Sequence, residues 1–154
     1  MGGLPLTGLA RDDDMREALG GLSVGAVRMA EGLLYRIPEL RRQIRERRRD
    51  IIEANLGLPV TEVKVQRSRV DDMAQQRAIR LATDRKLAEM VAQVRTVDAV
   101  LSQVPPVVRK VVAMRFWMGL TWAEIAERVP AGYNTVQRWT RHVVQLVAFA
   151  MGWR

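Results

Sequence analysis

Five side chains near the C-terminus have the types and the three- and four-residue spacing of a contact face on a helix. These residues are Tyr133, Asn134, Gln137, Arg138 and Arg141. Asn and Gln can form paired hydrogen bonds with adenine, and Arg can do so with guanine or bind phosphate. The run from Arg128 to Arg154 contains no Asp or Glu. Because a face that meets only water normally mixes both charges, the pattern favours DNA binding over an ordinary packed hairpin.

A helix-turn-helix is predicted to hold this face outward. Thr121 is a suitable N-cap, and Glu124 three residues later completes a capping box. Pro130-Ala131-Gly132 breaks the helix, and a second helix is predicted from Tyr133 to Phe149. Apolar residues on the two helices are expected to pack together. They are Trp122, Ile125, Ala126 and Val129 on the first helix, and Val136, Trp139 and Val143 on the second.

The composition favours an all-α binding protein over an enzyme. The chain has 154 residues, of which 48% are hydrophobic, enough for the core of one compact domain with a helical extension. It has no Cys, and its one His, His142, cannot build a metal site or a catalytic dyad alone. No Gly-rich phosphate loop is visible. We therefore expect no catalytic residue, no metal and no cofactor.

The net charge of +8 and the sequence pI of about 11.1 predict a polyanionic partner, nucleic acid before an anionic membrane. From Ala99 to Arg154 there are seven basic residues and two acids, so positive charge is concentrated around the motif. Met1–Ala10 does not have the basic start of a signal peptide. No apolar run approaches the roughly 18 residues of a spanning helix. These features predict a cytoplasmic protein of a bacterium or a phage-infected cell.

Four segments are predicted along the chain. Residues 1–55 form an N-terminal helical, Arg-rich segment, 56–70 a linker, 71–104 a long central helix, and 105–154 the DNA-binding domain. Three acids, Asp12, Asp13 and Asp14, suit the start of a short helix. A metal site there is disfavoured because adjacent acids point in different directions on a helix.

Ser23 is the predicted cap of the next helix, in which Pro38 either kinks one long helix or starts a new one. A narrow apolar stripe follows Leu33, Ile37, Leu40 and Ile44. Two uses fit this stripe: a seam between two copies of the chain, or packing on the central helix of the same chain, which we favour. The surrounding arginines between residues 36 and 49 fit either DNA phosphates or a solvated face.

The central helix is predicted to be capped by Asp71 or Asp72 and to run to Gln103. Its expected apolar stripe consists of Ala74, Ala78, Leu81, Leu87, Val91, Val94, Val97 and Leu101. Residues 60–66 are predicted to be an extended linker. The next helix, Val107–Met118, is expected to bury Val108, Val111, Val112, Met114 and Phe116, and to expose Arg109, Lys110 and Arg115. Gly119 is predicted to end it.

The run from Leu101 to Ala126 resembles region 4 of bacterial sigma factors, in which a helix beginning near Pro leads into a helix-turn-helix. Over residues 30–154 the chain resembles the RinA/ArpU-like phage transcription regulators more closely. Four features carry this resemblance. They are Tyr35-Arg-Ile-Pro38 before an Arg-rich helix ending in Asp50-Ile51-Ile52, Val70-Asp71-Asp72 leading to Arg77-Ala78-Ile79-Arg80-Leu81-Ala82, Tyr133-Asn134-Thr135-Val136-x-Arg138-Trp139, and Ala148 to Trp153.

The resemblance implies a sequence-specific activator of phage late or packaging genes that binds double-stranded DNA and acts through host RNA polymerase. The implied DNA-binding residues on the recognition helix are Tyr133, Asn134, Thr135, Gln137, Arg138 and Arg141. We further expect Arg115 and Arg128 to hold the DNA backbone. One departure is Pro130, at a turn position where Gly is common. Since Pro cannot adopt a positive φ, Gly132 is expected to take the unusual dihedral.

Two other functions fit the same sequence features. A small terminase subunit also pairs a helix-turn-helix with oligomerising helices, and it would form a ring of many subunits. A sigma-like factor would instead dock on RNA polymerase and have little DNA affinity alone. For a regulator, one helix-turn-helix covers a small footprint, which favours a homodimer on paired half-sites.

Overall fold

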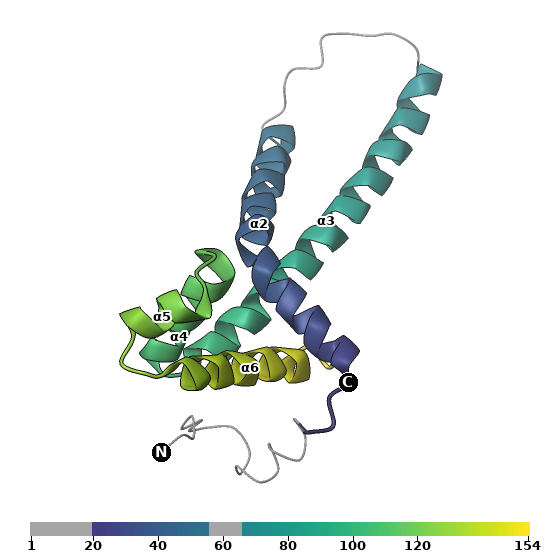
Figure 1. The fold of residues 1–154 in the computed structure, drawn as a ribbon. Coiled ribbons are helices and arrows are strands. Elements are labelled where there is room, and N and C mark those ends of the chain that lie inside the picture. The colour runs from purple at the N-terminus through teal and green to yellow at the C-terminus, as the bar shows by residue number, and fades with distance from the viewer. Residues whose placement is uncertain (1–19, 56–65) are drawn as a thin grey trace. The chain divides into compact units, whose positions relative to one another are not determined.

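The computed structural model describes residues 20–55 and 66–154, and it is all-α within them (Figure 1). The elements are α2 Val24–Asn55, α3 Gln66–Ser102, α4 Pro106–Val112, the π-helical turn η1 Ala113–Trp117, α5 Trp122–Arg128 and α6 Tyr133–Ala150. This confirms the predicted fold class, with a long central helix that leads into a C-terminal helix-turn-helix. In the described part of the chain, no helix is both long and apolar enough to cross a membrane.

The chain divides into two compact units. One unit contains the chain up to Pro38 together with Gln93–Arg154, and the other is Glu39–Ala92. Each of α2 and α3 therefore contributes to both units, and the division falls inside these two helices. The C-terminal helices share their unit with the start of α2 and the end of α3.

Ser23 joins the two ends of the first unit. Its Oγ accepts a hydrogen bond from the N–H of Ala26 at 3.1 Å, which is the predicted N-cap of α2. The same hydroxyl donates to the carbonyl oxygen of Arg154 at 2.7 Å. One side chain thus satisfies a free donor at the start of α2 and fixes the last residue of the chain.

The C-terminus is held by a glycine cap after α6. Gly152 has φ +76°, a value that residues with a Cβ rarely adopt. This conformation lets the N–H of Trp153 donate to the carbonyl of Ala148 at 3.0 Å, as in a Schellman motif. The guanidinium of Arg154 then lies 4.9 Å from the ring centre of Phe149. The closing residues are therefore folded back on α6.

Pro38 lies inside the continuous helix α2, which answers the question that the sequence left open. Pro has no N–H, so the carbonyl of Leu34 one turn earlier loses its usual helical donor. The indole Nε1–H of Trp117 donates to that carbonyl instead, at 2.9 Å. Beside it, the rings of Tyr35 and Phe116 meet edge to face at 4.7 Å between centres. The helical defect at Pro38 is thereby the attachment point for η1.

We expect Trp117→Phe to lower the free energy of unfolding by about 1–2 kcal/mol, because the Leu34 carbonyl is left without a donor. In a Pro38→Ala background the helix itself supplies the N–H, so the same replacement should cost roughly 1 kcal/mol less. Urea unfolding of the four proteins, followed by the fluorescence of the remaining tryptophans, measures this coupling. Equal costs in both backgrounds would mean that the indole contributes only by packing.

The apolar stripe of α2 is buried within a single chain. Leu33 and Ile37 are at most 1% exposed, and Leu40 and Ile44 are 8% and 7% exposed. This stripe is therefore not available as a seam between copies, and its burial within one chain is confirmed.

The predicted central helix begins earlier than expected and is buried over only part of its stripe. α3 starts at Gln66 rather than at Asp71 or Asp72, since no Gly or Pro interrupts residues 66–70. Val94, Val97 and Leu101 are buried as predicted. The expected stripe members Ala74, Ala78 and Leu81 are exposed, Leu81 by 68%. Helical periodicity identifies an apolar face but not whether another element covers it.

Two predicted features lie outside the described residues. They are the short helix opened by Asp12, Asp13 and Asp14, and the 56–65 part of the linker.

Candidate nucleic-acid interface

The first helix of the helix-turn-helix, α5, begins with the predicted capping box. Thr121 Oγ1 accepts the N–H of Glu124 at 3.2 Å, and the Glu124 carboxylate accepts the N–H of Thr121 at 3.2 Å. Hydrogen bonds from the side chain and backbone of Thr121, with a smaller effect of the Arg128 charge, lower the pKa of Glu124. The carboxylate of Glu124, one of the two acids between Ala99 and Arg154, is thus partly occupied within α5.

The turn between α5 and α6 is built without a positive φ. Val129 is extended, at φ −128° and ψ 153°, as residues before proline prefer. The N–H of Ala131 donates to the carbonyl of Val129 at 2.8 Å. Gly132 has φ −75° and is the N-cap residue of α6, so the expected unusual dihedral at Gly132 is wrong. The predicted start of the second helix at Tyr133 is nevertheless confirmed.

Gly119 supplies a positive φ one element earlier. It has φ +69° directly after the π-helical turn, where the N–H of Met118 donates to the carbonyl of Ala113 at 2.9 Å. This confirms the predicted break between the helix that starts at Pro106 and the helix-turn-helix. The break sets the direction in which α5 leaves α4 and η1.

The inner faces of α4, η1, α5 and α6 form one apolar cluster. Its buried members are Val111, Met114, Ile125, Val129 and Val136. Trp122, Ala126 and Trp139 pack against it and are half-buried. The predicted interior faces of both helices are therefore confirmed, with the two tryptophans at the edge of the core rather than inside it. Because Ile125 and Val136 are fully buried, α6 cannot rotate about its axis without exposing apolar surface.

The opposite face of α6 carries most of the residues predicted to contact DNA. Asn134, Arg138 and Arg141 are exposed, and Tyr133 is 49% exposed. Thr135 and Gln137 are half-buried. Within residues 20–55 and 66–154, the side chains of Asn134, Arg138 and Arg141 have no hydrogen bond or ion pair to the protein. The face offers unengaged amide and guanidinium groups, which suit base edges and phosphate.

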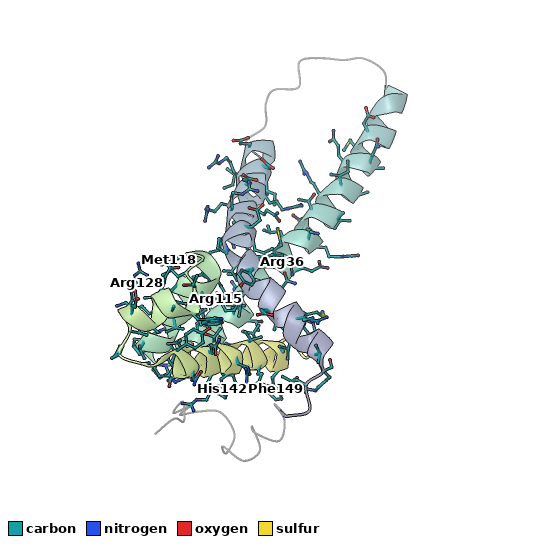
Figure 2. All side chains as sticks on the ribbon, viewed as in Figure 1. Arg36, Arg115, Met118, Arg128, His142 and Phe149 are labelled. Carbon is teal, nitrogen blue, oxygen red and sulfur yellow. The ribbon has the colours of Figure 1, made fainter. Side chains whose placement is uncertain are left out.

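The two arginines predicted to hold the DNA backbone come from elements other than α6, Arg115 from η1 and Arg128 from the end of α5 (Figure 2). Arg128 is exposed, and its guanidinium donates to the carbonyl of Glu124 at 3.4 Å. Arg115 is half-buried: it donates to the carbonyl of Leu120 at 3.2 Å and stacks on Trp122 at 4.1 Å from the ring centre. The expectation that Arg115 faces outward is wrong, because the aromatic face of Trp122 and a turn carbonyl attract its guanidinium.

Residues 33–148 match the protein family described as a protein of unknown function, DUF722. The chain belongs to the DUF722 family. No curated protein and no solved structure matches it. The matched region of this DUF722 protein includes most of α2, all of α3, and the helix-turn-helix up to Ala148. The match therefore extends over both the Arg-rich part of α2 and the outer face of α6.

Two residues of the DUF722 protein that sequence reasoning missed lie just before the matched region. Val27 and Glu31 of α2 line a surface hollow of about 250 Å³ together with Gln137 and Arg141 of α6. Glu31 is exposed and brings a negative charge beside the otherwise acid-free second helix. No local pattern could reveal this neighbour, because more than a hundred positions separate Glu31 from Gln137. The hollow marks one edge of the basic face.

Proposed function

We propose that this protein is a sequence-specific transcriptional regulator that binds double-stranded DNA by inserting α6 into the major groove. In this proposal Asn134 and Gln137 hydrogen-bond adenine, and Arg138 or Arg141 hydrogen-bonds guanine. Tyr133 contacts phosphate or a thymine methyl group. Arg128 contacts the DNA backbone, and Arg115 does so with the guanidinium N–H groups that Leu120 does not use.

The observation that carries the proposal is the contrast between the two faces of α6. Its inner face is anchored in the core by Val136, and its outer face presents Asn134, Arg138 and Arg141 without intramolecular partners in the described chain. The solvated face of a helix that only packs on a core normally mixes both signs of charge, whereas every charged residue of α6 is basic. The absence of any Asp or Glu from residues 128–154 supports a polyanionic partner.

The experiment that tests the proposal is selection of bound sequences from a pool of random DNA duplexes. We expect enrichment of a short motif, with affinity for it about a thousandfold or more above that for random duplex at equal salt concentration. Recovery of a pool with no enriched motif would contradict sequence-specific binding. A footprint on the genome that encodes the protein would then locate the natural site.

The RinA/ArpU resemblance extends the proposal to activation of phage late or packaging genes through host RNA polymerase. A small terminase subunit is the alternative function, and a measurement of the mass of the assembly distinguishes it from a regulator. Because the α2 stripe is buried within one chain, it is not available to join subunits of a ring. We therefore expect a monomer or a dimer on DNA, and a closed ring of many subunits would favour packaging instead.

A further inference from the structure

The second unit carries a basic helix face that the proposed recognition helix does not include. Between Glu39 and Arg49, α2 contains six arginines and two glutamates. Arg42 hydrogen-bonds both of these glutamates, with its Nε–H donating to Glu39 at 2.9 Å and a terminal nitrogen to Glu46. These bonds to Arg42 lower the pKa of Glu39 to about 2. One arginine is thus the partner of both carboxylates.

Three of the remaining arginines form a continuous charged face. Arg45, Arg48 and Arg49 are exposed, and their spacing of three and four positions places them on one side of the helix. In the described parts of the chain, no ion pair joins them to a carboxylate, including those of the nearby Asp50 and Glu53. With a rise of about 1.5 Å per residue, they span roughly 6 Å along the helix axis. Like charges this close repel one another unless an anion lies beside them.

The apolar stripe of α2 that lies beside this face argues against a membrane as that anion. A basic amphipathic helix binds lipid when its apolar side is free to enter the bilayer surface. Here the stripe residues Leu40 and Ile44 are 8% and 7% exposed, so they are already buried in the protein. A phosphate backbone needs no apolar contact. Each strand of duplex DNA presents a phosphate about every 3.4 Å of axis, and an arginine guanidinium can hydrogen-bond a phosphate with two N–H groups.

We propose that the face formed by Arg45, Arg48 and Arg49 is a second DNA-binding surface, which binds the phosphate backbone without sequence preference. This second proposal rests on the proposed function, because duplex DNA is taken from there as the polyanion that the arginines bind. The arginine face increases the affinity for any DNA duplex and keeps the protein on DNA while it moves to its site. The residues of α6 select which sequence is bound.

The test is the salt dependence of binding to a mixed-sequence duplex of about 30 base pairs, measured by fluorescence anisotropy for Arg45→Gln/Arg48→Gln/Arg49→Gln. We expect affinity to fall roughly tenfold at about 0.1 M salt. The slope of log affinity against log salt should become shallower by up to about 2.7, which is about 0.9 for each lost phosphate contact. The corresponding triple Lys variant should keep most of the slope, and Arg48→Gln alone should lower it by about 0.9.

The matched control removes three exposed arginines from α3 in the same unit, as Arg77→Gln/Arg80→Gln/Arg85→Gln. Asp84 lies between Arg80 and Arg85, and Asp72 lies five residues before Arg77, so we expect the slope to stay close to that of the wild type. An equal decrease of the slope in this control variant would mean that only the net charge of the protein matters, and it would overturn the inference. An unchanged slope in the α2 variant, or a loss confined to binding of phosphatidylserine vesicles, would overturn it as well.

The two proposals can fail separately. If the α2 variant loses affinity for every duplex and selection finds no motif, the phosphate-binding surface stands and the regulator proposal fails. If selection finds a motif and the α2 variant binds mixed-sequence DNA like the wild type, the regulator proposal stands and the proposal of a second DNA-binding surface fails.

Discussion

Arg138→Ala should weaken binding to the selected DNA site by about 1–3 kcal/mol, or roughly 5- to 150-fold, with a much smaller loss on random duplex. Arg138 is exposed on the outer face of α6, one turn after Asn134, and it has no partner within the described protein. A bidentate bond to guanine is lost with the side chain, whereas a phosphate contact would be lost on every sequence alike. Anisotropy titrations with both duplexes at one salt concentration measure the difference.

Arg109→Ala is the matched control, since Arg109 is an exposed arginine of α4 in the same unit and lies off the α6 face. It changes the net charge by the same amount and should weaken both duplexes equally and slightly. An equal loss on both duplexes for Arg138→Ala would assign Arg138 to phosphate instead of base contact. Sequence preference would then have to come from Asn134, Gln137 or Arg141.

The parts of this interface that could be predicted from sequence are those fixed by neighbouring residues. The spacing of Thr121 and Glu124 is sufficient for a capping box, and Pro106 in a first helical turn marks the start of α4. The helical spacing of apolar and polar residues from Tyr133 onward predicts both the buried face and the exposed face of α6. Each of these signals operates within a few residues, where helix geometry determines the result.

The parts that could not be predicted depend on contacts between distant residues. The helical spacing of apolar residues from Val107 to Met118 predicts an exposed Arg115, but its guanidinium stacks on Trp122 of the next helix. The apolar spacing of Leu81 matches that of Val97, yet only Val97 is covered by the fold. The glycine found in common turns predicts a positive φ at Gly132, whereas the structure has an extended Val129 before Pro130 and a φ of −75° at Gly132.

Ile125→Ala should lower the free energy of unfolding of the first unit by about 2–5 kcal/mol, the largest stability effect expected in this chain. Ile125 is fully buried in the cluster that joins α5 to α6, so the replacement leaves a cavity where Val136 and Val129 lose contacts. All four tryptophans lie between Trp117 and Trp153 in this unit. Tryptophan fluorescence during urea unfolding therefore reports on it, while circular dichroism follows both units.

The control is Ile79→Ala, which makes the same chemical change at a helical position of α3 that is 59% exposed. It should alter stability by no more than about 0.5 kcal/mol, since no packed neighbours lose their contacts there. Because the Ile125 cluster fixes the rotation of α6, Ile125→Ala should also lose specific DNA binding near its lowered melting temperature and recover it on cooling. A melting curve for Ile125→Ala that coincided with that of Ile79→Ala would contradict the packing of α5 against α6, and with it the outward direction of Asn134 and Arg138.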